Sequence, residues 1–311
     1  MNKPLSLMFA LGLALGAGAV QATDDDRPVD ERRPLKADAR VEVSNVAGQI
    51  TVETWDKNEL HLTGSLSEQV EKLEITGDAS RLKIDVKLPR RSRNVDDTIL
   101  HLKVPAGIAL EAEGVSADVT VRGIKGDVEA ASVSGDVELV VGSKNIEAQS
   151  VSGDVTIDAP SAIVTRVESV SGDVTVRGVK GEVRGETVSG DIEVMAHTAN
   201  RIELQSVSGS LELDGELAAD ADVEGKTMSG DIRLTLPRLP EASIELQTYS
   251  GEVEGGDALT QAGGGSREEK EYWRKGSGSG RVRLHSFSGD IDLRIRDVSE
   301  KRTVEKRVEK K

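Results

Sequence analysis

Residues 132–139 read Ser-Val-Ser-Gly-Asp-Val-Glu-Leu, and close variants of this stretch recur along most of the chain. Ser precedes the central residue in every copy, and that central residue is Gly in all copies but the first. The centres are Ala117, Gly135, Gly153, Gly172, Gly190, Gly209, Gly230, Gly251 and Gly289. Successive centres lie 18, 18, 19, 18, 19, 21, 21 and 38 residues apart. The last step fits two turns of 19 residues, one of them with an altered sequence. A fixed period of this size is typical of stacked repeats.

Each copy predicts two short strands. After the centre, aliphatic and polar residues alternate, as in Val137-Glu138-Leu139, and the same alternation precedes it in Ile146-Glu147-Ala148-Gln149-Ser150. A period of two marks a strand with one buried face, and the frequent Gly and β-branched residues exclude helix. A unit of about 18 residues cannot bury its apolar face alone, whereas stacked units share a continuous core.

These patterns predict an all-β, single-stranded β-solenoid with coils of about 18–21 residues and a less regular, β-rich N-terminal cap. The alternative is a barrel or sandwich of hairpins. Hairpin arrays do not require the same turn at the same phase of every unit, so the solenoid is favoured. At about 4.8 Å per coil, nine coils would form a rod on the order of 40 Å long.

The Ser-Gly-Asp corner has a structural and a functional interpretation. Structurally, Gly would supply a positive φ, Asp an Asx-turn, and the Ser or Thr three positions before the centre an inward hydroxyl that bonds to backbone or to its stacked neighbours. Functionally, a column of carboxylates about 4.8 Å apart would repel and could bind a cation such as Ca²⁺. We favour the structural turn and expect no other cofactor. The candidate metal ligands are Asp118, Asp136, Asp154, Asp173 and Asp191.

The N-terminus has the features of a secretory signal peptide. Lys3 precedes an apolar run that ends in Val20-Gln21-Ala22, so residues 1–22 are expected to be cleaved after Ala22. No later segment is apolar enough to cross a membrane, so no transmembrane span is expected in the mature form. The chain contains no Cys, which excludes disulfides and lipid attachment at an N-terminal cysteine. A formal net charge of −15 disfavours nucleic acid as a partner and favours cations.

The remaining segments complete the expected organisation. Residues 23–36 are charged, contain two prolines and are interpreted as a flexible leader. Residues 37–110 are expected to form β-rich first coils and the cap, and 111–296 the repeat solenoid. A Gly-rich loop insertion is expected at 256–280. Its Tyr272 and Trp273 are a candidate binding spot or a cover for the core. Residues 297–311 are a highly charged tail.

No motif points to catalysis. The four histidines, His61, His101, His197 and His285, are far apart in sequence, and there is no phosphate loop, dinucleotide fingerprint or H-E-x-x-H pair. The carboxylates recur with the repeat. A structural role in every coil requires such repetition, whereas a single active site does not. We therefore expect no enzyme.

Three stretches resemble a bacterial family of unknown function, DUF4097, whose members are often labelled adhesins. They are VEVSNVAGQITVETWDKNEL at 41–60, LHLKVPAGIAL at 100–110, and the series of SVSGDV corners that ends in SFSGDIDL at 286–293. The resemblance covers about residues 37–296. It implies a β-solenoid associated with the cell envelope or surface, and it carries over no catalytic residue.

Together these features predict an exported, non-catalytic, adhesin-like module that binds envelope polysaccharide, peptidoglycan or protein. The expected location is the periplasm, with the cell surface or the extracellular space as alternatives. Two other functions stay open, a self-assembling envelope polymer and a carbohydrate-active β-helix enzyme.

Overall fold

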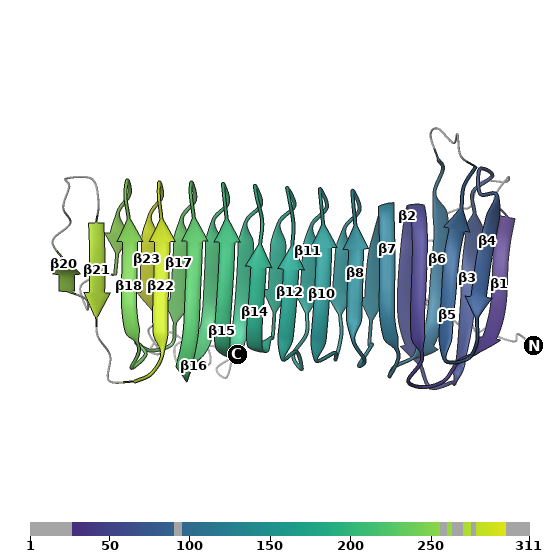
Figure 1. The fold of residues 1–311 in the computed structure, drawn as a ribbon, viewed down its shortest axis with the longest axis horizontal. Helices are drawn as coiled ribbons and strands as arrows, with labels where there is room; N and C mark the ends of the chain where they lie inside the picture. The colour runs from purple at the N-terminus through teal and green to yellow at the C-terminus, as the bar shows by residue number, and fades with distance from the viewer. Residues whose placement is uncertain (1–26, 90–94, 256–259, 263–269, 275–277, 297–311) are drawn as a thin grey trace, which may run out of the picture.

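The computed structural model describes residues 27–89, 95–255, 260–262, 270–274 and 278–296, with side chains for all of these except 260–262 and 270–274. The described residues form a long rod of β-strands (Figure 1). Twenty-three strands join in one hydrogen-bonded system, β1 to β23. The prediction of an all-β solenoid is confirmed.

The repeats form two long faces that meet at the Ser-Gly-Asp corner. The first face carries the strands before each corner: the first half of β7 (Ala109–Arg122), β8 (Val128–Ser132), β10 (Asn145–Ser150), β12 (Val164–Glu168), β14 (Lys180–Glu186), and the second halves of β15 (Ile192–Ser206) and β16 (Leu211–Thr227). The second face carries the strands after each corner: the second half of β7, β9 (Val137–Val140), β11 (Val155–Asp158), β13 (Val174–Arg177), the first halves of β15 and β16, and β17 (Ile232–Leu236).

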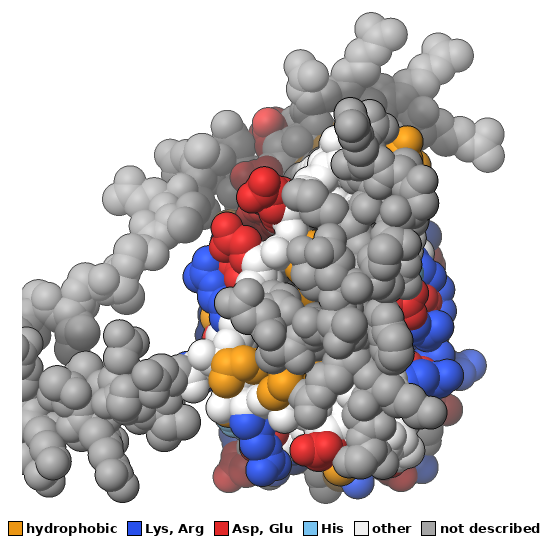
Figure 2. All heavy atoms as spheres, turned by 90° about the vertical axis from the view of Figure 1, so that its left-hand side faces the viewer, with side chains coloured by type: hydrophobic (Ala, Val, Ile, Leu, Met, Phe, Trp, Pro, Cys, Tyr) orange, Lys and Arg blue, Asp and Glu red, His pale blue; other side chains and the backbone are white. Residues whose placement is uncertain are grey.

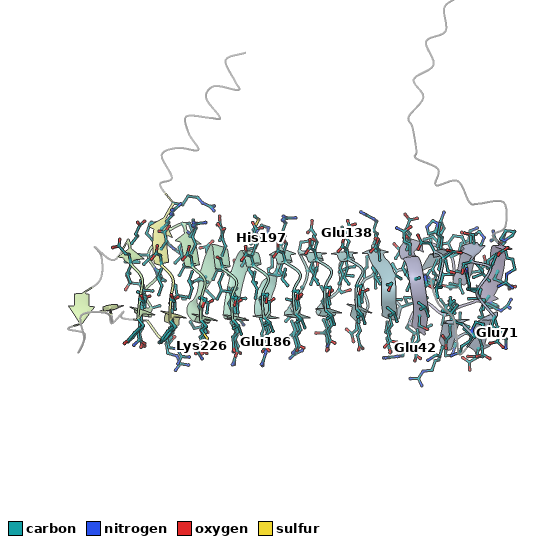
Figure 3. The ribbon with its side chains drawn as sticks, turned by 90° about the horizontal axis from the view of Figure 1, so that it is seen from above. Glu42, Glu71, Glu138, Glu186, His197 and Lys226 are labelled. Atoms are coloured by element: carbon teal, nitrogen blue, oxygen red, sulfur yellow. The ribbon has the colours of Figure 1, made fainter. Side chains whose placement is uncertain are left out.

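Equivalent residues of successive coils lie in register. Val155 of β11 pairs with Val137 of β9 on one side and with Val174 of β13 on the other, all in parallel. The alternation of the sequence therefore becomes two kinds of column. Inward columns of Val, Ile, Leu and Ala form one continuous buried core. Outward side chains project from both faces into solvent, with Glu186 and Lys226 on one face and Glu138 and His197 on the other (Figure 3).

The C-terminal coils are not stacked in sequence order, and here the sequence-based prediction is wrong. The step of 38 residues is not two turns of 19. Instead β22 (Arg281–Ser286) pairs with β16 on one side and β18 (Ser243–Thr248) on the other. On the second face, β23 (Ile291–Ile295) likewise lies between β17 and β19 (Val253–Glu254). The last coil in sequence is thus inserted one layer inside the end of the rod.

The expected loop at 256–280 includes two strands in its described part. β21 (Lys270–Arg274) pairs antiparallel with β18, and β20 (Thr260–Ala262) pairs antiparallel with β21. These strands form the left-hand end of the rod in Figure 1. β21 runs opposite to the coils, and its antiparallel pairing with β18 interrupts the parallel stack.

The N-terminal end also departs from sequence order. β2 (Arg40–Trp55) spans both faces and lies between β7 and a coil formed by β5 (Arg81–Lys87) and β6 (Thr98–Pro105). Beyond that coil, β4 (Lys72–Gly77) pairs antiparallel with β5, and β3 (Glu59–Leu66) pairs antiparallel with β6. This is the irregular cap that the sequence indicated.

The predicted flexible leader is corrected in part. Residues 23–26 lie outside the described residues, but β1 (Arg27–Pro34) is a strand that pairs antiparallel with β3 along its whole length. Among the described strands β1 pairs with β3 alone, so Pro28 and Pro34 stand in an edge strand, where proline is tolerated. The predicted signal peptide and the charged tail lie outside the described residues. No helix in the described part of the chain is long and apolar enough to cross a bilayer.

Candidate binding groove and the Ser-Gly-Asp corner

The corner glycines are required for close approach between coils and not for a positive φ, which corrects the sequence-based interpretation. None of them is among the described glycines with positive φ, which include Gly48, Gly123 and Gly178. A Cβ added to Gly172 would lie 1.9 Å from the carbonyl oxygen of Gly153 in the preceding coil. Stacked corners therefore leave no space for a side chain.

From the second copy onward, the Ser or Thr three positions before the centre points inward and bonds to backbone, as predicted. The Ser150 hydroxyl accepts the N–H of Gly153 at 3.0 Å, and the Ser169 hydroxyl accepts that of Gly172 at the same distance. The Ser132 hydroxyl also donates to the carbonyl of Ala117 in the preceding coil at 2.9 Å. These buried hydroxyls satisfy backbone groups that the turn leaves unpaired.

The aspartates form a ladder of hydrogen bonds to the backbone. Oδ1 of Asp136 accepts the N–H of Asp154 at 2.9 Å, and Oδ1 of Asp154 accepts the N–H of Asp173 at 2.9 Å. The ladder reaches Ser210, which donates its N–H to Asp191 but has no carboxylate to offer. We name Asp118, Asp136, Asp154, Asp173 and Asp191 the aspartate row.

The sequence-predicted metal candidates are therefore brought together in one column, and each carboxylate has an amide partner. Among the described residues, no group of three or more His, Asp or Glu side chains is arranged to hold a metal ion. The geometry supports the structural interpretation, in which backbone N–H groups stabilise the negative charge.

An exposed apolar ridge runs beside the corner, and it is the feature that the sequence interpretation missed. The residue two before each centre is apolar in every coil and points to solvent. Val133, for example, is 45% exposed and Phe287 is 58% exposed. The apolar ridge consists of Val115, Val133, Val151, Val170, Val188, Val207, Met228, Phe287 and Tyr249, in spatial order.

The ridge is fixed by backbone hydrogen bonds. The N–H of Ser152 donates to the carbonyl of Val133 at 3.0 Å, and the N–H of Ser171 donates to that of Val151 at 2.9 Å. The same bond recurs in coil after coil. At the C-terminal end of the ridge, the rings of Tyr249 and Phe287 stack with centroids 5.1 Å apart and planes 6° from parallel. Each ridge residue is thus held one coil from the next.

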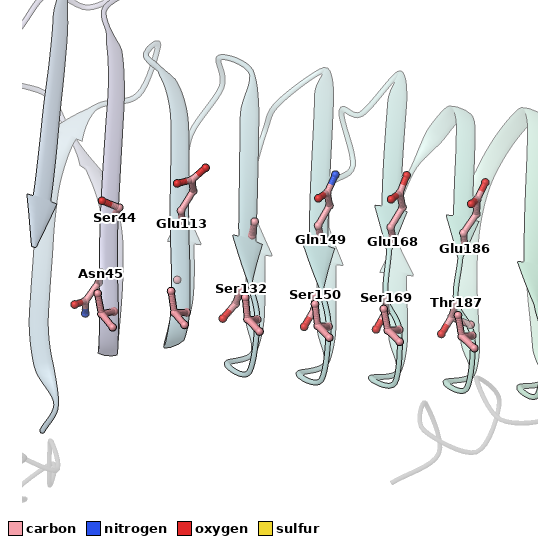
Figure 4. A pocket seen from close by; sticks show the side chains of 18 of the residues that line it. Ser44, Asn45, Glu113, Ser132, Gln149, Ser150, Glu168, Ser169, Glu186 and Thr187 are labelled. Carbon is pink, nitrogen blue, oxygen red and sulfur yellow. The ribbon is translucent and has the colours of Figure 1, made fainter. Parts of the chain in front are cut away.

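A groove of about 710 Å³ follows the ridge across the N-terminal half of the rod. The ridge forms one wall from Val115 to Val188, and the outward residues four before each centre form the other. We name this second wall the polar row: Glu113, Ala131, Gln149, Glu168 and Glu186. Figure 4 shows Glu113, Gln149, Glu168 and Glu186 aligned above the row of Ser132, Ser150, Ser169 and Thr187.

Carboxylates border this groove and lie next to one another. On the first face, partial burial and the like charges of Glu111 and Glu147 raise the pKa of Glu129. The carboxylate of Glu111 bonds to the Arg40 guanidinium and raises the pKa of Arg40. Within the polar row, Glu186 pairs with Arg184. Glu113 and Glu168 line the groove and form no ion pair with another described residue.

Tyr272 and Trp273 lie on β21, far from this groove at the C-terminal end of the rod. Their backbone pairs with Leu246 and Glu245 of β18. The structure gives their strand but not their side chains, so their predicted binding role stays a prediction. In Figure 2, which faces this end, charged side chains line both flanks of the rod.

Comparison with known protein families matches residues 35–294 to the model described as Toastrack DUF4097. The chain belongs to the Toastrack DUF4097 family. The resemblance inferred from the sequence is therefore confirmed over nearly the same residues. A comparison with curated proteins found no match.

Comparison with solved structures found several that are similar to this chain. One, provisionally named a lipid binding protein, is from Parabacteroides distasonis; it is 16% identical, with a TM-score of 0.50 over 86% of this chain and 96% of that one. A provisionally named adhesin from the same organism is 14% identical, with a TM-score of 0.47 over 86% and 98%. Another such adhesin, from Bacteroides fragilis, is 13% identical, with a TM-score of 0.39 over 86% and 97%.

Proposed function

We propose that this Toastrack chain is an exported, non-catalytic binding rod of the cell envelope that holds a partner along its side. One observation carries the proposal: an apolar ridge and a bordering groove repeat in register through coil after coil. Monomeric proteins rarely expose long contiguous apolar patches unless the patch has a role in binding. A row of identical side chains suits an elongated partner better than a compact one.

A non-catalytic role agrees with how the polar side chains are used. The aspartate row and the inward hydroxyls bond to backbone at each corner. His61 contacts Asp30 at 2.9 Å and His101 contacts Glu53 at 3.1 Å, both in the N-terminal cap, while His285 contacts Gln247 at 2.9 Å. None of these three contacts includes a Ser or Thr hydroxyl that a neighbouring base could activate.

The expected partners are an envelope polysaccharide, peptidoglycan or an envelope protein. The lipid-binding name given to the Parabacteroides distasonis structure favours a binding role. Nucleic acid is disfavoured by the net charge of −15. Growth by end-to-end stacking is disfavoured because antiparallel strands, β1, β3 and β4 at one end and β20 and β21 at the other, interrupt the parallel stack.

The test combines fractionation with crosslinking in cells. The full chain with a C-terminal tag is expected in the periplasmic or surface fraction, shortened at its N-terminus, and crosslinked to envelope components. Recovery from the cytoplasm at full length would contradict export. Exported protein that yields no crosslinked species in intact cells would contradict the binding role.

A further inference from the structure

The spacing and charge of the groove point to one class of partner. We propose that the segment of the apolar ridge from Val115 to Val188, together with the polar row, binds an amphipathic α-helix of a partner protein. That helix has an apolar seam flanked by Lys or Arg and lies along the axis of the rod. This inference rests on the proposed binding role and names its partner.

The period of the ridge matches a helix better than an extended strand. Coils are about 4.8 Å apart, as adjacent strands are, and a helix repeats its face about every 5.4 Å. An extended strand presents same-face side chains about every 6.7 Å. Over the four steps from Val115 to Val188, the mismatch reaches roughly 2 Å for a helix and roughly 8 Å for a strand. A helix of about 13 residues would span this segment of about 19 Å.

Charge decides which helix fits. The ridge runs between the polar row, with Glu113, Glu168 and Glu186, and the aspartate row on the other side of the corner. Neither row contains Lys or Arg in these five coils. A helix with basic residues beside its apolar seam would therefore meet carboxylates on both sides. The same rows repel anionic headgroups, which makes the surface of an anionic membrane a poor alternative.

The ridge is also organised before binding. Its residues are fixed through the corner backbone, where Ser134 donates to Val115 at 2.8 Å and Ser189 donates to Val170 at 2.9 Å. Valine has few rotamers, so little conformational freedom is lost when a partner covers it. The ridge valines are 42% to 48% exposed, which leaves apolar surface to bury on binding.

The experiment uses the whole mature chain and three fluorescent synthetic peptides of the same length. The first has a Leu seam flanked by Lys, the second has the same seam flanked by Glu, and the third is a scrambled form of the first. Anisotropy titrations should show that the Lys-flanked peptide binds at least tenfold more tightly than either of the others. Equal binding of the scrambled peptide would overturn the proposal, because charge alone would then explain it.

Variants locate the site. The triple variant Val133→Ser, Val151→Ser and Val170→Ser should weaken binding of the Lys-flanked peptide at least tenfold, and Glu168→Lys should weaken it severalfold. The matched control is Val140→Ser, which changes another exposed valine, 37% exposed, on the second face. Because all these side chains are exposed, the variants should keep the melting temperature of the parent. Undiminished binding by the folded triple variant would overturn the proposal.

Two outcomes separate this inference from the broader role. Ridge-dependent binding of the chain to zwitterionic phospholipid vesicles, without binding of the Lys-flanked peptide, would replace the helix by a lipid. If the Lys-flanked peptide does not bind while envelope crosslinks persist in cells, the helix inference is wrong and the broader binding role is still supported.

Discussion

At the scale of the residue, three positions at or near the Ser-Gly-Asp corner each have a physical task. The inward hydroxyl three before the centre satisfies the glycine amide, the glycine lets successive coils touch, and the aspartate accepts an amide from the next coil. The apolar residue two before the centre has no such task in the fold. It can therefore be changed without damage to the coil, whereas the glycine cannot.

Gly172→Ala is expected to destabilise the rod by about 3 kcal/mol, since the new methyl group would meet the Gly153 carbonyl and force the coils apart. Gly142→Ala is the control, because the nearest atom to its Cβ is Cγ of the flexible Lys125 at 3.4 Å. Urea unfolding of both variants measures the difference. Equal stability of the two variants would show that close approach does not explain the corner glycines.

Asp154→Ala should cost about 1–2 kcal/mol, because the N–H of Asp173 loses its acceptor. Asp154→Asn should be nearly neutral, since the amide oxygen can take over that bond and repulsion along the aspartate row falls. Unfolding free energies of the two variants provide the check. If asparagine were as damaging as alanine, the charge and not the acceptor would matter.

Glu129 gives a prediction about pH. Partial burial and the neighbouring Glu111 and Glu147 raise its pKa above the ordinary value of 4.5, so its ionised form destabilises the fold. Glu129→Gln should therefore be more stable than the parent at pH 7. As pH falls through the raised pKa the parent binds a proton and regains stability, and below pH 4 the difference should vanish. Thermal melts at several pH values test this, and a difference that persists at low pH would contradict it.

At the scale of the element, the aspartate row links successive coils through hydrogen bonds. Its side chains do not only stabilise the turn in which each one stands. One oxygen of each carboxylate is already used by a backbone amide. We therefore expect the same melting temperature in EDTA and in millimolar Ca²⁺. A clear upward shift with Ca²⁺ that is lost in Asp136→Asn would restore the cation ladder as the explanation.

The inserted elements β22 and β23 hold the last layers of the rod together. Leu284 of β22 is 2% exposed and lies in the core between the neighbouring layers. Leu284→Ala should cost about 2–4 kcal/mol and speed hydrogen exchange in β18, whose residues 243–248 rest on β22. Leu139→Ala, buried in a coil near the middle, is the control. If both variants left exchange in β18 unchanged, the inserted layer would not be what supports it.

At the scale of the whole molecule, the sequence predicted the architecture because its period is the period of the structure. Alternation around Val137 and its equivalents specifies which side chains are buried, and the common phase of the corners specifies stacking in columns. The order of the end layers did not follow, because the spacing from Gly251 to Gly289 does not say which coil lies beside which. Pairings formed far along the chain decide that order.

The candidate site was less predictable than the fold. No role was predicted for Val133 and Val151, since a sequence does not show that an apolar residue beside a corner points away from the core. The corner glycines were predicted to have a positive φ. Glycine at a corner is equally compatible with close stacking of coils, and the sequence does not distinguish these two roles. In β1, the charges and prolines indicated a leader, although an edge strand exposed to water accepts both. The position of the ridge valines, the role of the corner glycines and the structure of β1 all depend on contacts between layers that are distant in sequence.

The inserted coil also bears on when the rod can be finished. β16 to β19 precede β22 and β23 in the chain, yet in the finished rod β22 separates β16 from β18 and β23 separates β17 from β19. We therefore expect a chain without its last coil to lack the pairings that connect β18 and β19 to β16 and β17. We expect the insertion of β22 and β23 to complete the rod, because these two strands pair in parallel with strands from an earlier part of the chain on both sides.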